Sequence, residues 1–194
     1  VYRISFSGEL SYEVAVPASK GQALWDALRE AGAEWDVTPY GTEALHVMRA
    51  EKGFIMIGDE TDGTISPRDL GLGWAVSRKK ADFLGKRGMM RADLVREDRP
   101  RLVGLETEDP AEVLPIGAHA VEGRNPDRSL RTIGYVTSSY RSPTLERSIA
   151  MALIERGPER MGETLRFPLG RGKVLKAKIV KPGWYDPEGE RQDA

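Results

Sequence analysis

The chain has 194 residues, 40% of them hydrophobic, so it is long enough to bury a sizeable core in one or two domains. Its 29 basic and 30 acidic residues nearly cancel, which argues against nucleic acid or an anionic membrane as a partner. The absence of cysteine excludes disulfides, thiolate metal sites and cysteine catalysis within these residues and favours a cytoplasmic location. No apolar run approaches the roughly 20 residues that span a bilayer, so no membrane partner is expected.

Two short extended segments joined around Gly8 open the chain, because apolar and polar residues alternate there. If Phe6 and Glu13 face a common cavity, they suit a planar heterocycle such as a pterin, with its ring on the aromatic and two donors on the carboxylate. The alternative is a solvated strand carboxylate beside a core aromatic. Since this pattern starts without an initiator Met, we expect the chain to be part of a longer polypeptide.

Two helices are predicted next. The first begins with a capping-box pattern at Ser19 and Gln22 and ends at Gly32. The second begins near Thr38-Pro39, because proline is favoured at the first helical position, and ends at Gly53. Both carry apolar residues at helical spacing, which predicts that one face of each packs against a core.

The segment after the second helix predicts a buried strand over residues 54–57 and an amphipathic helix over residues 85–96. Asp59, Glu60 and Asp62 lie between them in a turn bounded by glycines. They lack the ligand spacing of a calcium-binding loop, so we interpret them as turn formers.

A charged, proline-containing segment at residues 96–101 predicts a domain boundary, which divides the chain into residues 1–97 and 98–194. Short apolar runs between turn signals then suggest a small antiparallel barrel or sandwich, and an α+β fold for the whole chain. These runs cover residues 102–106, 113–121, 132–137, 149–154, 164–167 and 174–180. Gly170-Arg171-Gly172 indicates a hairpin loop, and the run at 149–154 fits a buried strand or a buried helix equally well.

Four motifs together resemble the family of the glycine-cleavage T-protein, an aminomethyltransferase, and they cover nearly the whole chain in the family's order. They are Gly8-Glu9-Leu10-Ser11-Tyr12-Glu13-Val14, residues 41–54, Gly71-Leu72-Gly73-Trp74, and residues 133–138 followed by Ser142-Pro143-Thr144-Leu145. The resemblance implies the C-terminal half of a folate-binding domain in residues 1–97, followed by a C-terminal β-barrel in residues 98–194. It also implies a tetrahydrofolate site in a central channel.

The resemblance assigns three cofactor-binding residues. Phe6 matches the aromatic that packs on the pterin, and Glu13 matches the carboxylate that holds its amino and ring N–H groups. Tyr185 matches a C-terminal aromatic of the site, or Trp184 does if the alignment shifts by one residue. No catalytic residue is expected in this segment, because the aspartate that assists one-carbon transfer in the family is expected before Val1.

Within the family, the segments Thr42-Glu43-Ala44-Leu45-His46 and Arg49-Ala50-Glu51-Lys52-Gly53-Phe54 most resemble the C-terminal part of the alpha subunit of a heterotetrameric N-methylglycine oxidase. Leu45-His46 stand where T-proteins usually carry Arg-Asp, and this departure fits the oxidase subunit better. The resemblance implies that tetrahydrofolate captures the carbon removed from the substrate as 5,10-methylenetetrahydrofolate, or that formaldehyde is released. FAD, FMN and NAD are expected elsewhere in the complex, with beta, gamma and delta subunits as partners. The chain alone is expected to be inactive.

Two alternatives remain open. An aminomethyltransferase would use the same folate pocket to receive a lipoyl-bound aminomethyl group. A non-catalytic folate-binding module is the other alternative, although those relatives typically carry a Cys after Lys-Gly, where this chain has Phe54. His46 and His119 are far apart in sequence and show no ligand spacing, so no metal site is predicted.

Overall fold

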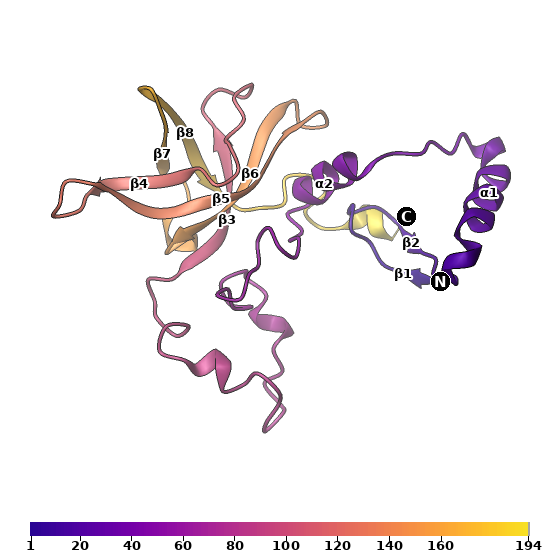
Figure 1. Ribbon diagram of the computed structural model, residues 1–194, viewed down its shortest axis with the longest axis horizontal. Coiled ribbons are helices and arrows are strands. Elements are labelled where there is room, and N and C mark those ends of the chain that lie inside the picture. The colour runs from indigo at the N-terminus through magenta and orange to yellow at the C-terminus, as the bar shows by residue number, and fades with distance from the viewer. Residues whose placement is uncertain (194) are drawn as a thin grey trace.

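The computed structural model describes residues 1–193 as a β-barrel joined through a central helix to a smaller N-terminal part. The barrel lies at one end of the molecule, and the N-terminal strands and both chain termini lie at the other (Figure 1). Residues 58–98, which precede the barrel in the chain, form a long excursion that extends below the barrel in the view of Figure 1, with turns and short 3-10 helices but no long element.

The barrel is closed and wholly antiparallel, with strand order β3-β6-β5-β4-β7-β8. Its strands are β3 (Pro100–Thr107), β4 (His119–Arg124), β5 (Leu130–Ser142), β6 (Arg147–Glu155), β7 (Thr164–Gly170) and β8 (Lys173–Val180). The antiparallel barrel and the β7–β8 hairpin loop at residues 170–172 are confirmed. The run at 113–121 was expected to be one strand, but β4 starts only at His119.

β6 explains why the run at 149–154 was ambiguous. Its alternate residues Ala150, Ala152 and Ile154 face the barrel core, whereas Ile149, Met151 and Leu153 pack in a second cluster that contains Ala50 of helix α2. Because both faces are buried, the strand shows no polar alternation, and periodicity alone cannot separate it from a helix.

The N-terminal part contains two-residue strands β1 (Tyr2–Arg3) and β2 (Tyr12–Glu13) and helices α1 (Gly21–Ala31) and α2 (Thr42–Glu51). The 3-10 helices are Ala18–Lys20, Ala33–Trp35, Gly73–Ala75, Gly88–Met90, Gly157–Arg160 and Glu190–Gln192. The predicted capping box is wrong: Ser19 lies inside a 3-10 turn, and no side chain caps α1. The second helix starts at Thr42, after extended Gly41, rather than at Pro39.

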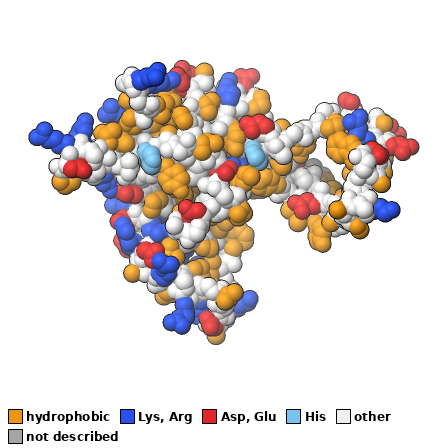
Figure 2. All heavy atoms as spheres, in the orientation of Figure 1, with side chains coloured by type: hydrophobic (Ala, Val, Ile, Leu, Met, Phe, Trp, Pro, Cys, Tyr) orange, Lys and Arg blue, Asp and Glu red, His pale blue; other side chains and the backbone are white. Residues whose placement is uncertain are grey.

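The apolar stripe of α1 is exposed rather than packed against a core. None of its residues is buried, and Trp25 and Leu28 each expose about half of their surface. Figure 2 shows hydrophobic side chains on the surface of this N-terminal part. Among residues 1–193, no helix is long and apolar enough to cross a bilayer.

Two predicted elements between α2 and the barrel are absent. Residues 54–57 form no strand, because the Phe54 carbonyl accepts a hydrogen bond from Arg49 and the Met56 N–H donates to Glu60, so side chains occupy these backbone groups. Residues 85–96 form only the 3-10 turn at Gly88–Met90. Leu84 is fully exposed just before them, so no core is present for a helix to cover.

Asp69 and Arg99 fasten the excursion to the start of the barrel. The Arg99 guanidinium donates from Nε and Nη2 to the Asp69 carboxylate at 2.7–3.1 Å, and the Ser66 N–H donates to the same carboxylate at 2.8 Å. Burial alone would raise the pKa of Asp69, but these hydrogen bonds outweigh it and hold the pKa below its usual value.

Replacing Asp69 by asparagine should lower the free energy of unfolding at pH 7 by about 1–3 kcal/mol, because a charged hydrogen-bonded pair is lost. Since the folded-state pKa is lowered, this stabilisation is fully present above the unfolded value of about 3.9 and is lost as the pH falls through the folded value. Urea unfolding at a series of pH values should therefore show the two proteins converging in acid. Glu97→Gln, at an exposed carboxylate, is the control; a pH-independent difference for Asp69→Asn would contradict this reading.

Candidate functional site

The predicted site residues Phe6 and Glu13 lie in a small hairpin at the N-terminal end of the molecule. Strands β1 and β2 pair through Tyr2 with Glu13 and Arg3 with Tyr12, and Phe6 is half-buried in the loop between them. Glu13 is exposed, and its carboxylate has no hydrogen-bond or ion-pair partner within residues 1–193. Both of its oxygens therefore remain available as acceptors.

A glycine turn sets the path of this loop. Gly8 has φ +87°, and its N–H donates to Ser5 Oγ at 3.0 Å. A Cβ atom at this position would lie 2.6 Å from Cδ of Lys52 at the end of α2, so only glycine lets the loop approach the helix this closely. The lack of a side chain at residue 8 therefore lets the segment that carries Phe6 pack against α2.

The C-terminal tail, residues 181–193, brings Tyr185 to the same end of α2. The N–H groups of Trp184 and Tyr185 both donate to the Glu51 carbonyl, at 2.8 and 3.1 Å. The Trp184 indole donates to Glu106 of β3 at 3.0 Å and packs on Gly104, where a Cβ atom would lie 2.7 Å from the ring. The Trp184 side chain therefore packs on the barrel. This favours Tyr185 as the aromatic residue of the predicted site.

The tail also contacts the end of α2 and the N-terminal loop. Lys52 Nζ donates to the Asp186 carboxylate at 2.6 Å, and this contact holds the pKa of Asp186 below its usual value. Arg191 pairs with Glu9 at 2.8 Å. The structure thus brings the segments of Phe6 and Tyr185 together, while Glu13 lies at the far end of the hairpin; a single pocket formed by all three stays a prediction.

An open hollow of about 280 Å³ lies between the loop and the tail, with Ser5, Ser11 and Asp193 in its lining. None of the three predicted site residues lines it. The hollow shows that the two segments leave space between them, but it does not by itself outline a pterin site.

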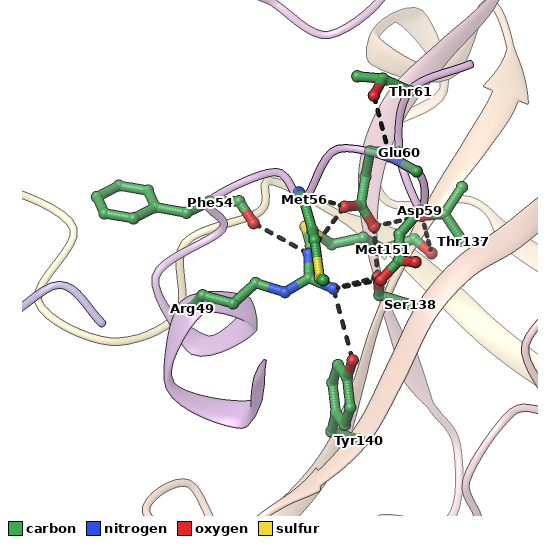
Figure 3. Close-up of polar contacts among 11 residues, drawn as sticks. Arg49, Phe54, Met56, Asp59, Glu60, Thr61, Thr137, Ser138, Tyr140 and Met151 are labelled. Carbon is green, nitrogen blue, oxygen red and sulfur yellow. Dashed lines mark hydrogen bonds and ion pairs between the residues drawn. The ribbon is translucent and has the colours of Figure 1, made fainter. Parts of the chain in front are cut away.

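A buried polar cluster beside this region was missed by sequence reasoning (Figure 3). Arg49 of α2 and Glu60 of the following turn are both fully buried, and Arg49 Nη1 donates to Glu60 Oε2 at 2.8 Å. Ser138 of β5 accepts a hydrogen bond from Arg49 at 2.6 Å and donates to Glu60, and Thr137 donates to Glu60 at 2.8 Å. The cluster locks α2 to the barrel.

The interpretation of Glu60 as a simple turn former is therefore wrong. Asp59 is exposed but also pairs with Arg49, at 3.1 Å, and Asp62 is an exposed turn residue whose carboxylate accepts from the Thr64 N–H. The sequence contains one indication of this buried cluster: Arg49 lies four residues after Leu45, and therefore on the same side of α2. A cation on the inward side of a helix requires a buried acceptor, although sequence alone does not identify which carboxylate provides it.

His46 lies on α2 and His119 begins β4, so the two histidines occupy different elements. Within residues 1–193, no group of three or more His, Asp or Glu side chains is arranged to hold a metal ion. Leu45 and His46, which replace the usual Arg-Asp pair, are both half-buried.

Two family profiles match the chain in order. The GCVT N-terminal domain matches residues 1–80, and the glycine cleavage T-protein C-terminal barrel domain matches residues 101–186. In a search of solved structures, aminomethyltransferase T of the glycine cleavage system from Bartonella henselae superposes with a TM-score of 0.79 at 24% identity. The superposition covers 95% of this chain and 49% of that one, and it supports the shared fold.

The chain is also similar to curated proteins over nearly its whole length. It is 46% identical over 200 residues to sarcosine oxidase subunit alpha from Corynebacterium sp. (strain P-1), and 43% identical over 192 residues to that of Rhizobium meliloti (strain 1021). It spans about a fifth of the length of these two relatives. An aminomethyltransferase from Caldanaerobacter subterraneus subsp. tengcongensis is 32% identical over 185 residues, which are 95% of this chain and 47% of that protein.

The matched profiles, the antiparallel barrel and the structural superposition agree with the predicted α+β fold, the C-terminal half of a T-protein-like domain followed by a small barrel. The chain therefore belongs to the glycine cleavage T-protein family, and within it the sequence is similar over its whole length to sarcosine oxidase alpha subunits.

Proposed function

We propose that this chain is the tetrahydrofolate-binding part of a sarcosine oxidase alpha subunit. The observation that carries the proposal is the difference in similarity: the identity is 46% to a sarcosine oxidase alpha subunit but 32% to an aminomethyltransferase, each over at least 95% of the chain. Leu45-His46, in place of the Arg-Asp pair usual in T-proteins, points in the same direction.

The residues present fit a reduced pterin. Glu13 offers two uncommitted carboxylate oxygens, which match an amino group beside a ring N–H. Phe6 and Tyr185 would contribute aromatic surface from the adjoining loop and tail. Flavins elsewhere in the complex would remove two electrons from sarcosine and pass them to oxygen, leaving glycine. Bound tetrahydrofolate would supply the two nitrogens that take up the oxidised methyl carbon, at the formaldehyde level, as 5,10-methylenetetrahydrofolate.

The rest of the reaction belongs outside this chain in the proposal. FAD, FMN and NAD would bind elsewhere in the complex, the beta, gamma and delta subunits would be its partners, and the complex would work in the cytoplasm. The chain alone would bind tetrahydrofolate weakly and turn nothing over. The division into residues 1–97 and 98–194 is kept as the proposed domain boundary.

Replacing Glu13 by alanine should weaken tetrahydrofolate binding roughly 10- to 100-fold, because two charge-assisted hydrogen bonds to the pterin are lost, together worth about 1.5–3 kcal/mol. Anaerobic isothermal titration of the chain with tetrahydrofolate measures the change. Glu34→Ala, at another exposed carboxylate of the N-terminal part, is the matched control and should bind like the unchanged chain. Equal affinity of Glu13→Ala and the unchanged chain would refute the assigned role of Glu13.

An aminomethyltransferase is the second candidate, favoured by the match of both family profiles and by the aminomethyltransferase relatives. The two functions differ in their substrate, so an assay of the full protein that contains this chain separates them. Oxygen consumption that depends on sarcosine supports the oxidase. Transfer from an aminomethylated lipoyl protein to tetrahydrofolate, without oxygen consumption, supports the aminomethyltransferase.

A further inference from the structure

Arg191, near the end of the chain, contacts both segments that carry the predicted aromatic site residues. Its Nε lies 2.8 Å from each carboxylate oxygen of Glu9, three residues after Phe6. Its guanidinium carbon lies 5.5 Å from the centre of the Tyr185 ring, within the range of a cation–π contact. Its carbonyl accepts a hydrogen bond from the Leu10 N–H at 3.0 Å. One side chain thus connects the Phe6 loop with the Tyr185 ring.

A second contact fixes the turn between Tyr185 and Arg191. The Asp186 carboxylate accepts hydrogen bonds from the Glu190 and Arg191 N–H groups at 3.0 and 3.3 Å, and it pairs with Lys52 at 2.6 Å. Asp186 itself has φ +45°, a conformation that costs energy for a residue other than glycine. The Asp186 carboxylate therefore stabilises this strained turn, and the turn fixes the position of Arg191 over Tyr185.

The Glu9–Arg191 pair is partly exposed, with 39% and 53% of the two side chains accessible. Pairs of this kind contribute little to global stability. The pair therefore has its main effect on the relative placement of the loop and the tail, and a test should measure placement and ligand affinity separately from unfolding.

We propose that Arg191 is a positioning residue of the folate site: by pairing with Glu9 and lying over Tyr185, it holds the Tyr185 ring against the loop that carries Phe6. The proposal rests on the proposed function, because the ligand it serves is tetrahydrofolate. It assigns Arg191 no contact with the ligand.

A charge swap tests the pair. Glu9→Arg and Arg191→Glu each place like charges together, so each should weaken tetrahydrofolate binding roughly 5-fold or more, and the double variant should recover most of the loss. The matched control is the similarly exposed barrel pair Glu112 and Lys173, 3.0 Å apart, whose reversal should leave the affinity unchanged. Unfolding midpoints should change little in any of these variants.

A second measurement does not depend on the ligand. Hydrogen exchange at the Leu10 amide, which donates to Arg191, should accelerate in both single variants and slow again in the double variant. Unchanged Leu10 exchange, or single variants that bind tetrahydrofolate like the unchanged chain while Glu13→Ala binds more weakly, would overturn the proposal. Failure of the proposed function looks different: the unchanged chain shows no tetrahydrofolate binding while Leu10 exchange still follows the charge swap, which refutes the folate site and retains the placement of Tyr185 by Arg191.

Discussion

Replacing Glu60 by alanine should lower the free energy of unfolding by about 3–5 kcal/mol, because the fully buried Arg49 guanidinium would lose its fully buried carboxylate partner and keep the partly exposed Asp59. The Ser138 hydroxyl and the Met56 N–H would lose their acceptor as well, whereas the Thr137 hydroxyl would keep the Met151 carbonyl at 3.1 Å. Removing the fully buried partner of a buried charge is more costly than removing a partly exposed one, because water cannot replace the lost interaction. Urea denaturation followed by circular dichroism measures the change.

Asp59 provides the matched control, since it is the adjacent residue and also pairs with Arg49, at 3.1 Å. Its carboxylate is 37% exposed, so Asp59→Ala should cost roughly 1 kcal/mol or less. If the two alanine variants were equally stable, Glu60 would not be the acceptor that compensates the buried arginine, and the lock between α2 and the barrel would need another explanation.

Replacing Gly53 by alanine should cost about 2–4 kcal/mol and displace the tail that carries Tyr185. Gly53 has φ +73°, and a Cβ atom there would lie 2.6 Å from the Gly183 nitrogen and 3.0 Å from the Pro182 carbonyl carbon. Both atoms belong to the backbone, so the tail itself has to move. The same substitution should therefore weaken tetrahydrofolate binding.

Gly58→Ala is the control that separates the cost of backbone strain from the cost of a steric clash. Gly58 also has a positive φ, +100°, but a Cβ atom there would meet nothing within 4 Å. It should therefore cost only the backbone strain, about 1–2 kcal/mol, and leave ligand binding unchanged. Urea unfolding measures the stability of Gly53→Ala and Gly58→Ala, and isothermal titration measures their affinity for tetrahydrofolate. A Gly53→Ala variant as stable as Gly58→Ala would show that the tail is not closely packed on α2.

The barrel was predictable because its signals are local. Apolar runs bounded by turn residues, and the Gly170-Arg171-Gly172 loop, depend only on neighbours in sequence, and the structure confirms an antiparallel barrel. The run at 149–154 was ambiguous for a physical reason, since β6 is buried on both faces. The family motifs supplied what local patterns did not, the identity of the fold.

The errors arose where side-chain hydrogen bonds or the absence of a core override local preference. Residues 54–57 have the composition of a strand, but the Arg49 and Glu60 side chains occupy their backbone groups. Residues 85–96 have the spacing of an amphipathic helix but no core to cover. Glu60 finds its hydroxyl partners in β5, some 77 residues further along the chain, and no local pattern reports such a contact.

The candidate site was predictable only in part. The resemblance assigned Phe6, Glu13 and Tyr185, and their joint role stays a prediction. The structure adds how two of their segments meet, through Gly8 packed on Lys52 and through Arg191 paired with Glu9. The Arg191–Glu9 pair joins the two ends of the chain, 182 residues apart, and could not be inferred from spacing.

Mapping where tetrahydrofolate binds tests whether the ligand occupies a site formed by the N-terminal hairpin and the C-terminal tail. Amide chemical shifts of the isotopically labelled chain should be recorded by NMR during an anaerobic titration with tetrahydrofolate. The largest changes in chemical shift should cluster at residues 5–13 and 184–191. Shifts confined to the groove between α2 and β5 that Glu43, Tyr140 and Arg141 line, or to the barrel surface, would contradict it.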